Sequence, residues 1–162
     1  MTFKTDLIRT LSKKNKIILS KYHYNYLGSK LFEKITKQKE YYPTRKEKEI
    51  LKKIAPKIPY LFKGNLSYVE IGSGAIDKIS ILINKSVKFY VPIDISYKFI
   101  KKSTKRLRKR FSFIKSIPLK ADYSKKFKIP KLNNTTKVFF FLGSSIGNFH
   151  DREEIKFLKQ LR

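Results

Sequence analysis

Gly72, Gly74 and Asp94 are the residues whose types and spacing are best suited to holding a ligand. Both glycines follow a short β-prone run, Tyr68 to Ile71, and glycine permits a sharp turn that leaves backbone amides exposed at the start of a helix. Asp94 ends a second β-prone run, which begins at Val87. In an open α/β sheet, an acid about twenty residues beyond such a turn can accept hydrogen bonds from both hydroxyls of a ribose. The spacing therefore predicts a nucleoside site at the carboxyl ends of two strands.

The glycine turn does not have the pattern of dinucleotide-binding proteins. That pattern needs a glycine at position 77, and Asp77 stands there, where an acid would repel a pyrophosphate. S-adenosylmethionine fits better, because it has a ribose, an adenine and an amino-acid tail but no phosphate. Lys78 is placed to pair with the carboxylate of that tail. The alternative is a structural turn that binds nothing, with Asp94 as the cap of the next helix.

Asp122 and Tyr123 are suited to the adenine of the same ligand. They follow a third β-prone run, residues 113–119. The carboxylate would accept a hydrogen bond from the exocyclic amine, and the aromatic ring would cover the base. The alternative is that Asp122 only caps a turn.

A loop rich in glycine and serine follows the most hydrophobic strand that the sequence predicts. Residues 137–142 read Lys-Val-Phe-Phe-Phe-Leu, a composition suited to the centre of a parallel sheet. The loop after them, from Gly143 to Asn148, would supply backbone amides and one side-chain amide. Because it would face the same crevice as Gly72 and Asp94, it is the expected place for a second substrate.

Strands and helices in alternation must hold these side chains in place. Apolar spacing predicts a helix over residues 76–83 and a strongly basic helix that ends near Arg110, with Ser96 as its N-cap. Thr44 and Glu47 form a capping-box pattern at the start of a further helix. We therefore predict an α/β fold with a parallel sheet, preceded by a helical N-terminal segment.

The composition indicates a folded chain about one domain in length. Of its 162 residues, 41% are hydrophobic and 14% aromatic, which is enough for a core. There is no cysteine, and the two histidines, His23 and His150, are too far apart for a metal-binding motif. No apolar run approaches the length of a membrane helix. We expect a cytoplasmic protein with no metal and no membrane partner.

The formal net charge of +27 has two interpretations. Lysine and arginine bind the phosphates of nucleic acids. Alternatively, an AT-rich genome raises the lysine content of every element, together with isoleucine, asparagine, phenylalanine and tyrosine. The densest block, residues 98–110, has Phe99, Ile100 and Leu107 at helical spacing, so its charges would lie on the outer face of an ordinary amphipathic helix. Nucleic acid is therefore the less favoured partner.

Six segments resemble the histidine-specific, S-adenosylmethionine-dependent methyltransferases of ergothioneine biosynthesis, which convert histidine to trimethylhistidine. In chain order they read YLGSKLF, EYYPTR, VEIGSG, YVPID, ADY and FLGSSIGNF, at residues 26–32, 40–45, 69–74, 90–94, 121–123 and 141–149. YLGSKLF, EYYPTR and FLGSSIGNF are far more specific than a glycine loop, and EYYPTR and FLGSSIGN together identify the family. The resemblance spans about residues 22 to 162 and implies a class I, Rossmann-like methyltransferase sheet.

The resemblance also implies which residues contact each ligand. The positions that match cofactor contacts are Gly72, Lys78, Asp94, Asp122 and Tyr123. The positions that match contacts to the amino-acid substrate, histidine, are Tyr24, Tyr41 and Asn148, with Gly143 nearby. No residue is expected to act as a catalytic nucleophile, because methyl transfer is an in-line displacement that needs alignment above all.

The family's chains are about twice as long as this one. Their complete sheet has the strand order 3-2-1-4-5-7-6, so we expect only the 3-2-1-4 part here, truncated after the fourth strand, with residues 137–142 at an open edge. We expect residues 1–62 to form a helical segment on the substrate side and residues 63–162 to form a partial S-adenosylmethionine-binding domain. A separately encoded C-terminal half is an expected partner.

Two alternatives to a histidine methyltransferase fragment stay open on the sequence alone. One is a methyltransferase-like protein that binds RNA, which only the charge favours. The other is a non-catalytic remnant, which the short length favours. The sequence does not decide whether the chain alone is an enzyme.

Overall fold

The protein is described by a computed structural model that covers residues 2–149 and 152–161. His150 therefore lies outside the described residues. Helices and strands follow in the order α1 (Phe3–Leu11), η1 (Ser20–His23), α2 (Tyr26–Ile35), α3 (Tyr42–Ile54), η2 (Ala55–Lys57), α4 (Ile58–Leu61), β1 (Leu66–Ile71), α5 (Ile79–Leu82), β2 (Val87–Asp94), α6 (Tyr97–Arg110), β3 (Lys115–Ser116), β4 (Leu119–Lys120), β5 (Thr136–Phe140), η3 (Ser145–Asn148) and α7 (Glu153–Leu161).

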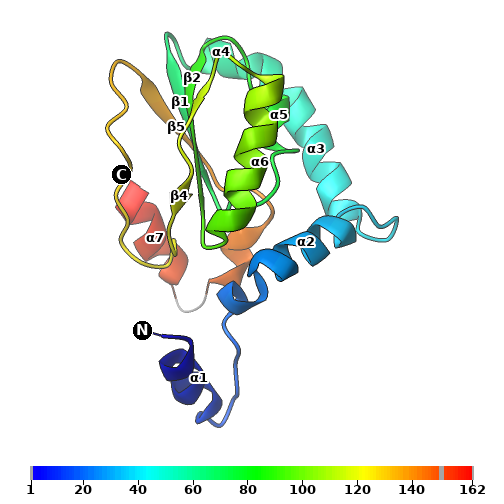
Figure 1. Ribbon diagram of the computed structural model, residues 1–162, viewed down its shortest axis with the longest axis vertical. Helices are drawn as coiled ribbons and strands as arrows, with labels where there is room; N and C mark the ends of the chain where they lie inside the picture. The colour runs from blue at the N-terminus through cyan, green and yellow to red at the C-terminus, as the bar shows by residue number, and fades with distance from the viewer. Residues whose placement is uncertain (1, 150–151, 162) are drawn as a thin grey trace.

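A parallel sheet forms the centre of the molecule (Figure 1). Its strand order is β3-β2-β1-β5, and β4 also pairs with β2. The paired strands are parallel throughout, as shown by the register of Val69 with Val91 on one side and with Phe139 on the other. With β3 and β4 counted as one interrupted strand, this is the 3-2-1-4 order that the sequence predicts. Among the described residues, β5 lies at the edge and pairs only with β1.

Helices cover one face of this sheet, and α7 with a long loop covers the other (Figure 1). The first face packs against α3, α4, α5 and α6, through side chains that include Leu51, Ile79 and Leu107. On the second face, Leu132 of the loop and Phe157 of α7 contact Val69 and neighbouring strand residues. Because both faces of the sheet are covered, β1 is buried along its whole length.

The basic helix lies as its periodicity predicts. Phe99, Ile100 and Leu107 of α6 are buried, whereas the lysines and arginines of residues 101–102, 105–106 and 108–110 are exposed. No helix within residues 2–149 and 152–161 is long and apolar enough to cross a membrane.

Three local predictions were wrong or incomplete. The helix expected over 76–83 is shorter, because only Ile79–Leu82 is α-helical and turns precede it. The third strand is split into β3 and β4, since Pro118 between them cannot donate a ladder hydrogen bond. The capping box at Thr44 does not form, because α3 already begins at Tyr42, with Pro43 in its first turn.

Candidate functional site

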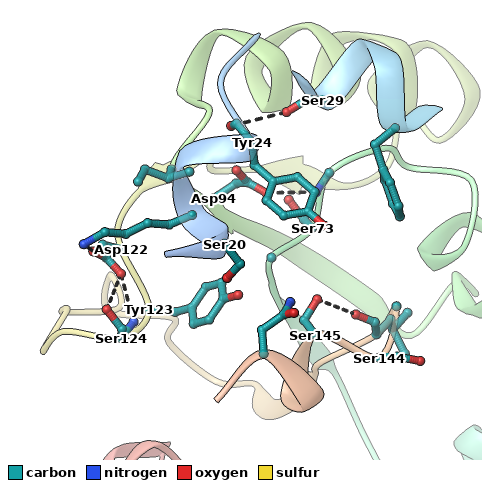
Figure 2. A pocket seen from close by; sticks show the side chains of 18 of the residues that line it. Ser20, Tyr24, Ser29, Ser73, Asp94, Asp122, Tyr123, Ser124, Ser144 and Ser145 are labelled. Carbon is teal, nitrogen blue, oxygen red and sulfur yellow. Dashed lines mark hydrogen bonds and ion pairs between the residues drawn. The ribbon is translucent and has the colours of Figure 1, made fainter. Parts of the chain in front are cut away.

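A cavity of about 790 Å³ lies between the carboxyl ends of the strands and the N-terminal helices. Its walls come from the loops after β1, β2, β4 and β5, from α2 and α3, and from the segment that precedes α2. Figure 2 shows Asp94, Tyr123 and Ser145 around this space. All nine site residues predicted from the sequence line it: Tyr24, Tyr41, Gly72, Lys78, Asp94, Asp122, Tyr123, Gly143 and Asn148.

The glycine turn at the end of β1 is held closely against β2. Gly72 and Gly74 have φ angles of 63° and 51°, a conformation that side chains disfavour. The amides of Gly72 and Ser73 donate to the Ile93 carbonyl, at 2.8 and 3.2 Å. The Gly74 amide donates to Asp94 Oδ2 at 3.2 Å. The expectation of free amides at a helix start was therefore wrong, since the β2 backbone and Asp94 already accept from these three donors.

Asp94 retains the ability to accept further hydrogen bonds. Besides the bond from Gly74, its Oδ1 accepts from the amide of Ser96 at 2.8 Å. Burial raises the pKa of Asp94, and backbone hydrogen bonds from Ser96 and Gly74 partly oppose this. Because an ionised carboxylate has about four acceptor positions, the two donors leave room for a diol. The N-cap of α6 is Ser96, so the cap role that the sequence offered as the alternative for Asp94 was wrong, and Asp94 instead closes the turn before that helix.

Asp122 is already engaged by two neighbours. Its Oδ1 accepts from the amide and hydroxyl of Ser124, at 3.1 and 2.6 Å, and its Oδ2 lies 3.3 Å from Lys21 Nζ. Burial opposes ionisation, but the bonds from Ser124 and the charge of Lys21 outweigh it and lower the pKa of Asp122. The side chain is thus an ionised acceptor at the cavity wall.

Tyr123 belongs to an aromatic cluster and faces the glycine turn. Its ring meets the rings of Phe141, Phe149 and Phe157 edge-on, with centroids 5.4 to 6.0 Å apart. A Cβ placed on Gly72 would lie 3.5 Å from Tyr123 Cε1. The ring therefore stands over the turn that follows β1, and burial raises its pKa to about 12.

Glu47 is a site residue that sequence reasoning missed. Its Oε1 accepts from the Gly143 amide at 2.6 Å, and its Oε2 lies 3.1 Å from Lys78 Nζ. Lys78 therefore has a protein partner, which the sequence did not indicate. The only sequence signal at Glu47 was the capping pattern with Thr44, and that pattern pointed to a local role.

The N-terminal segment contributes a tyrosine and an ion-pair network. Burial raises the pKa of Tyr24, and the negative charge of Asp94 adds to it. Lys21 pairs with Asp6 of α1 at 2.8 Å as well as with Asp122. Neither Lys21 nor Asp6 was predicted, because nothing in the sequence indicates contacts with residues so far along the chain.

Among the residues that the structure describes, no cluster of three or more histidine and acidic side chains could hold a metal ion.

A parallel α/β sheet with a ligand-sized cavity at its carboxyl edge, a glycine turn after β1 and an acid at the end of β2 places the chain in the class of Rossmann-like α/β folds. Residues 3–162 match the family model of the histidine-specific, SAM-dependent methyltransferases, and the chain belongs to this family.

Curated relatives agree with this family. The histidine N-alpha-methyltransferase of Mycobacterium tuberculosis is 29% identical over 99% of this chain, and that of Mycolicibacterium smegmatis is 28% identical over 96%. The ergothioneine biosynthesis protein 1 of Neurospora crassa is 31% identical over 84% of the chain and 16% of its own length. The chain spans about half the length of the two mycobacterial relatives, 51% and 50%.

A solved structure supports the fold alone. The chain superposes with a TM-score of 0.51 on a crystal structure from Methanococcus maripaludis, described as a candidate S-adenosyl-L-methionine-dependent methyltransferase, at 18% sequence identity. The match covers 92% of this chain and 62% of the other. It confirms the predicted class of sheet with helices before it.

Proposed function

We propose that the chain binds S-adenosylmethionine and forms the cofactor side of a histidine Nα-methyltransferase. The observation that carries this proposal is that all nine residues predicted from the sequence line one cavity. A volume of about 790 Å³ is in the range of small-molecule sites. Asp94 has free acceptor positions, and Tyr123 offers a ring beside the glycine turn. These groups fit a ligand with a ribose and an aromatic base.

The bound cofactor would supply an electrophilic methyl group on a positively charged sulfur. Asp94 would accept from the ribose hydroxyls, Asp122 from the exocyclic amine of adenine, and Tyr123 would cover the base. Lys78 would bind the carboxylate of the amino-acid tail.

Tyr24, Tyr41 and Asn148, with Gly143 nearby, would hold the histidine so that its uncharged amine points at the methyl carbon. These residues accelerate the reaction by alignment and by excluding water.

We propose that a second half completes the substrate pocket. The chain spans about half of its mycobacterial relatives, which motivates this step. In this arrangement residues 1–62 form the substrate side and residues 63–162 the cofactor side of the site. A chain that spans the remaining length of the relatives, added separately, is expected to restore histidine methylation.

Isothermal titration of S-adenosylmethionine into the purified chain tests the cofactor step. We expect saturable binding that Asp94→Ala weakens by at least about a hundredfold, because two hydrogen bonds to a charged group are lost. Asp77→Ala is the matched control, since Asp77 also lines the cavity but its side chain is 55% exposed and lies 3.8 Å from Lys48. Absence of binding by the folded wild-type chain would refute the proposal and favour a non-catalytic remnant.

RNA binding is a second candidate, and the exposed basic face of α6 favours it. The charges of residues 101–110 point away from the sheet, and only Arg106 approaches an acid, Glu33, at 3.9 Å among the described ion pairs. This function predicts salt-sensitive RNA binding that is lost when the block is neutralised. Cofactor binding that survives the same neutralisation would separate the two functions.

A further inference from the structure

Glu47, Lys78 and Gly143 form a compact polar cluster at one end of the cavity. The three residues come from α3, from the turn before α5 and from the loop after β5, so the fold alone brings them together. The Glu47 carboxylate spans the other two groups, with 2.6 Å to the Gly143 amide and 3.1 Å to Lys78 Nζ. A Cβ on Gly143 would come within 2.7 Å of Lys78 Nζ, so the flexible end of that lysine lies directly against the glycine.

The cluster has bonding capacity left on both charged groups. An ammonium group has three donors, and a carboxylate has about four acceptor positions. The bonds within the cluster use one donor of Lys78 and one position on each oxygen of Glu47. Both side chains are about one quarter exposed, and both line the cavity. The Lys78 ammonium group and the Glu47 carboxylate are therefore available side by side to a ligand in the cavity.

The cluster lies on the far side of the glycine turn from the groups suited to adenine. A Cβ placed on Gly72 would lie 3.5 Å from Tyr123 Cε1 and 3.8 Å from Ser145 Oγ. Ser145 is in turn within 4.0 Å of a Cβ on Gly143. The cavity thus runs from Asp122 and Tyr123, past Gly72 and Ser145, to Gly143 with Lys78 and Glu47. A nucleoside at the first end would send its 5′ substituent toward the second.

We propose that Glu47 completes the recognition of the zwitterionic amino-acid end of the cofactor, beside Lys78, to which the proposed function already assigns the carboxylate. Lys78 takes the α-carboxylate, and Glu47 takes the α-ammonium group, while the Gly143 amide keeps the Glu47 carboxylate in place. The inference rests on the proposed function, because it assigns a partner for each charge of the tail. A ligand with only an ammonium group would leave Lys78 without a carboxylate to bind, and a ligand with only a carboxylate would leave Glu47 without an ammonium group.

A series of adenosine ligands tests each charge separately. S-adenosylhomocysteine carries both charges, its decarboxylated analogue keeps only the ammonium group, and 5′-methylthioadenosine has neither. On the wild-type chain, calorimetry should rank their affinities in that order. The decarboxylated analogue should bind more tightly than 5′-methylthioadenosine, and equal binding of these two would overturn the assignment of Glu47.

Two isosteric variants locate the effect on the protein. Glu47→Gln should weaken S-adenosylhomocysteine by about tenfold to a hundredfold, as expected for a lost charged hydrogen bond, and leave 5′-methylthioadenosine unchanged. Lys78→Met should weaken S-adenosylhomocysteine but not the decarboxylated analogue. Glu49→Gln is the matched control, because this acid lies on the same helix, is mostly exposed and pairs only with Lys46 in the described contacts, at 3.0 Å.

The outcomes separate this inference from the function on which it rests. If Glu47→Gln weakens all three ligands equally, or leaves S-adenosylhomocysteine unchanged or tighter, Glu47 does not read the ammonium group and the inference is wrong. If the wild-type chain binds none of the ligands, the proposed function itself fails. Should Glu47→Gln not fold, the ligand series on the wild-type chain decides alone.

Discussion

Glu70 is an acid in the middle of the sheet, and only 1% of its surface is exposed. Its Oε2 accepts a hydrogen bond from the hydroxyl of Tyr90, and its Oε1 is buried without a hydrogen-bond partner among the described residues. Burial raises the pKa of Glu70 to about 8, against the smaller opposing effects of Tyr90 and Lys78. In the folded chain this carboxyl group therefore keeps its proton at neutral pH.

The raised pKa of Glu70 predicts a chain that loses stability as the pH increases. Between its ordinary pKa of 4.5 and about 8, Glu70 is ionised in the unfolded chain but protonated in the folded chain. The unfolded state thus binds fewer protons, so the free energy of unfolding falls as pH rises, by at most about 1.4 kcal/mol per pH unit. Glu70→Gln cannot ionise and should remove this slope. Urea unfolding of both proteins at pH 5, 6, 7 and 8 measures it.

The contrasting control is a carboxyl whose partners favour the charged form. Asp122→Asn should leave the slope above pH 5 unchanged, because the pKa of Asp122 is lowered. Parallel stability curves for wild type and Glu70→Gln would show that Glu70 is ionised in the folded chain.

Sequence reasoning at this scale succeeded where a residue's neighbours are local. Gly72, Gly74 and Asp94 belong to a strand–turn–helix–strand pattern that is visible within about twenty residues. All three line the cavity, and the Gly74 amide donates to Asp94. Glu47 was missed because its partner Gly143 is 96 residues away. A short sequence pattern can predict hydrogen bonds between residues that are close in the chain. A hydrogen bond between two distant elements depends on how those elements pack in the fold. The roles of the nine cavity residues in binding stay predictions.

At the scale of elements, α1 is held to the cavity by one buried acid. Asp6 is 2% exposed, pairs with Lys21 at 2.8 Å and accepts from the Tyr22 hydroxyl at 2.5 Å. These partners, with Arg9, hold the pKa of Asp6 well below its usual range. Most other contacts of this helix are exposed, since Phe3, Ile8 and Leu11 all face solvent to a large extent. α1 should therefore open independently of the sheet.

Asp6→Asn is expected to release α1 without unfolding the sheet. The amide cannot replace the charge that Lys21 requires, so Asp122 would be the one acidic partner left to Lys21 within residues 2–149 and 152–161. Hydrogen exchange should accelerate over residues 3–24 and stay unchanged in β1 and β2. Arg9→Gln is the control, because Arg9 is half exposed and its 3.5 Å pair with Asp6 contributes little. Equal protection of α1 in Asp6→Asn and wild type would show that other contacts hold the helix.

The same network predicts what acid does to α1. A lowered folded pKa means that Asp6 stabilises the folded state at and above the pKa of about 3.9 found in unfolded chains, and loses this effect as the pH falls toward the folded value. Exchange in α1 should thus be constant from neutral pH to about 4, once corrected for the intrinsic rate, and increase below that.

Long elements that pack on the core were predicted well from the sequence. Elements interrupted by turns were not. β1 and β2 agree closely with the predicted β-prone runs, and α6 agrees with its helical spacing, because these elements are buried against one another in the sheet and on its face. α5 is a single turn although Ile76, Ile79 and Ile83 have helical spacing. Ile76 and Ile83 still pack on the core from turn and extended backbone, so the same apolar spacing is satisfied without a helix.

For the molecule as a whole, two opposed features decide how it behaves in solution. Basic residues outnumber acidic ones by 39 to 12, so repulsion between copies is strong at low ionic strength. Against this, β5 pairs on one side only among the described residues, and an apolar strand at a sheet edge is a site for pairing with another chain. Salt screens the first feature and leaves the second nearly unchanged.

Self-association should therefore increase with salt. We expect the molar mass from size-exclusion chromatography with light scattering to stay at 19.2 kDa in about 20 mM NaCl and to rise with protein concentration in about 500 mM, where the Debye length is only a few ångströms. Replacing the exposed Lys101, Lys105 and Lys109 of α6 with glutamine removes three charges without changing β5 and should lower the salt concentration at which association begins. Adding the proposed C-terminal half should suppress association, because it would occupy the β5 edge. Association that weakens as salt rises would mean that ion pairs join the copies, and the open edge would then have no part in it.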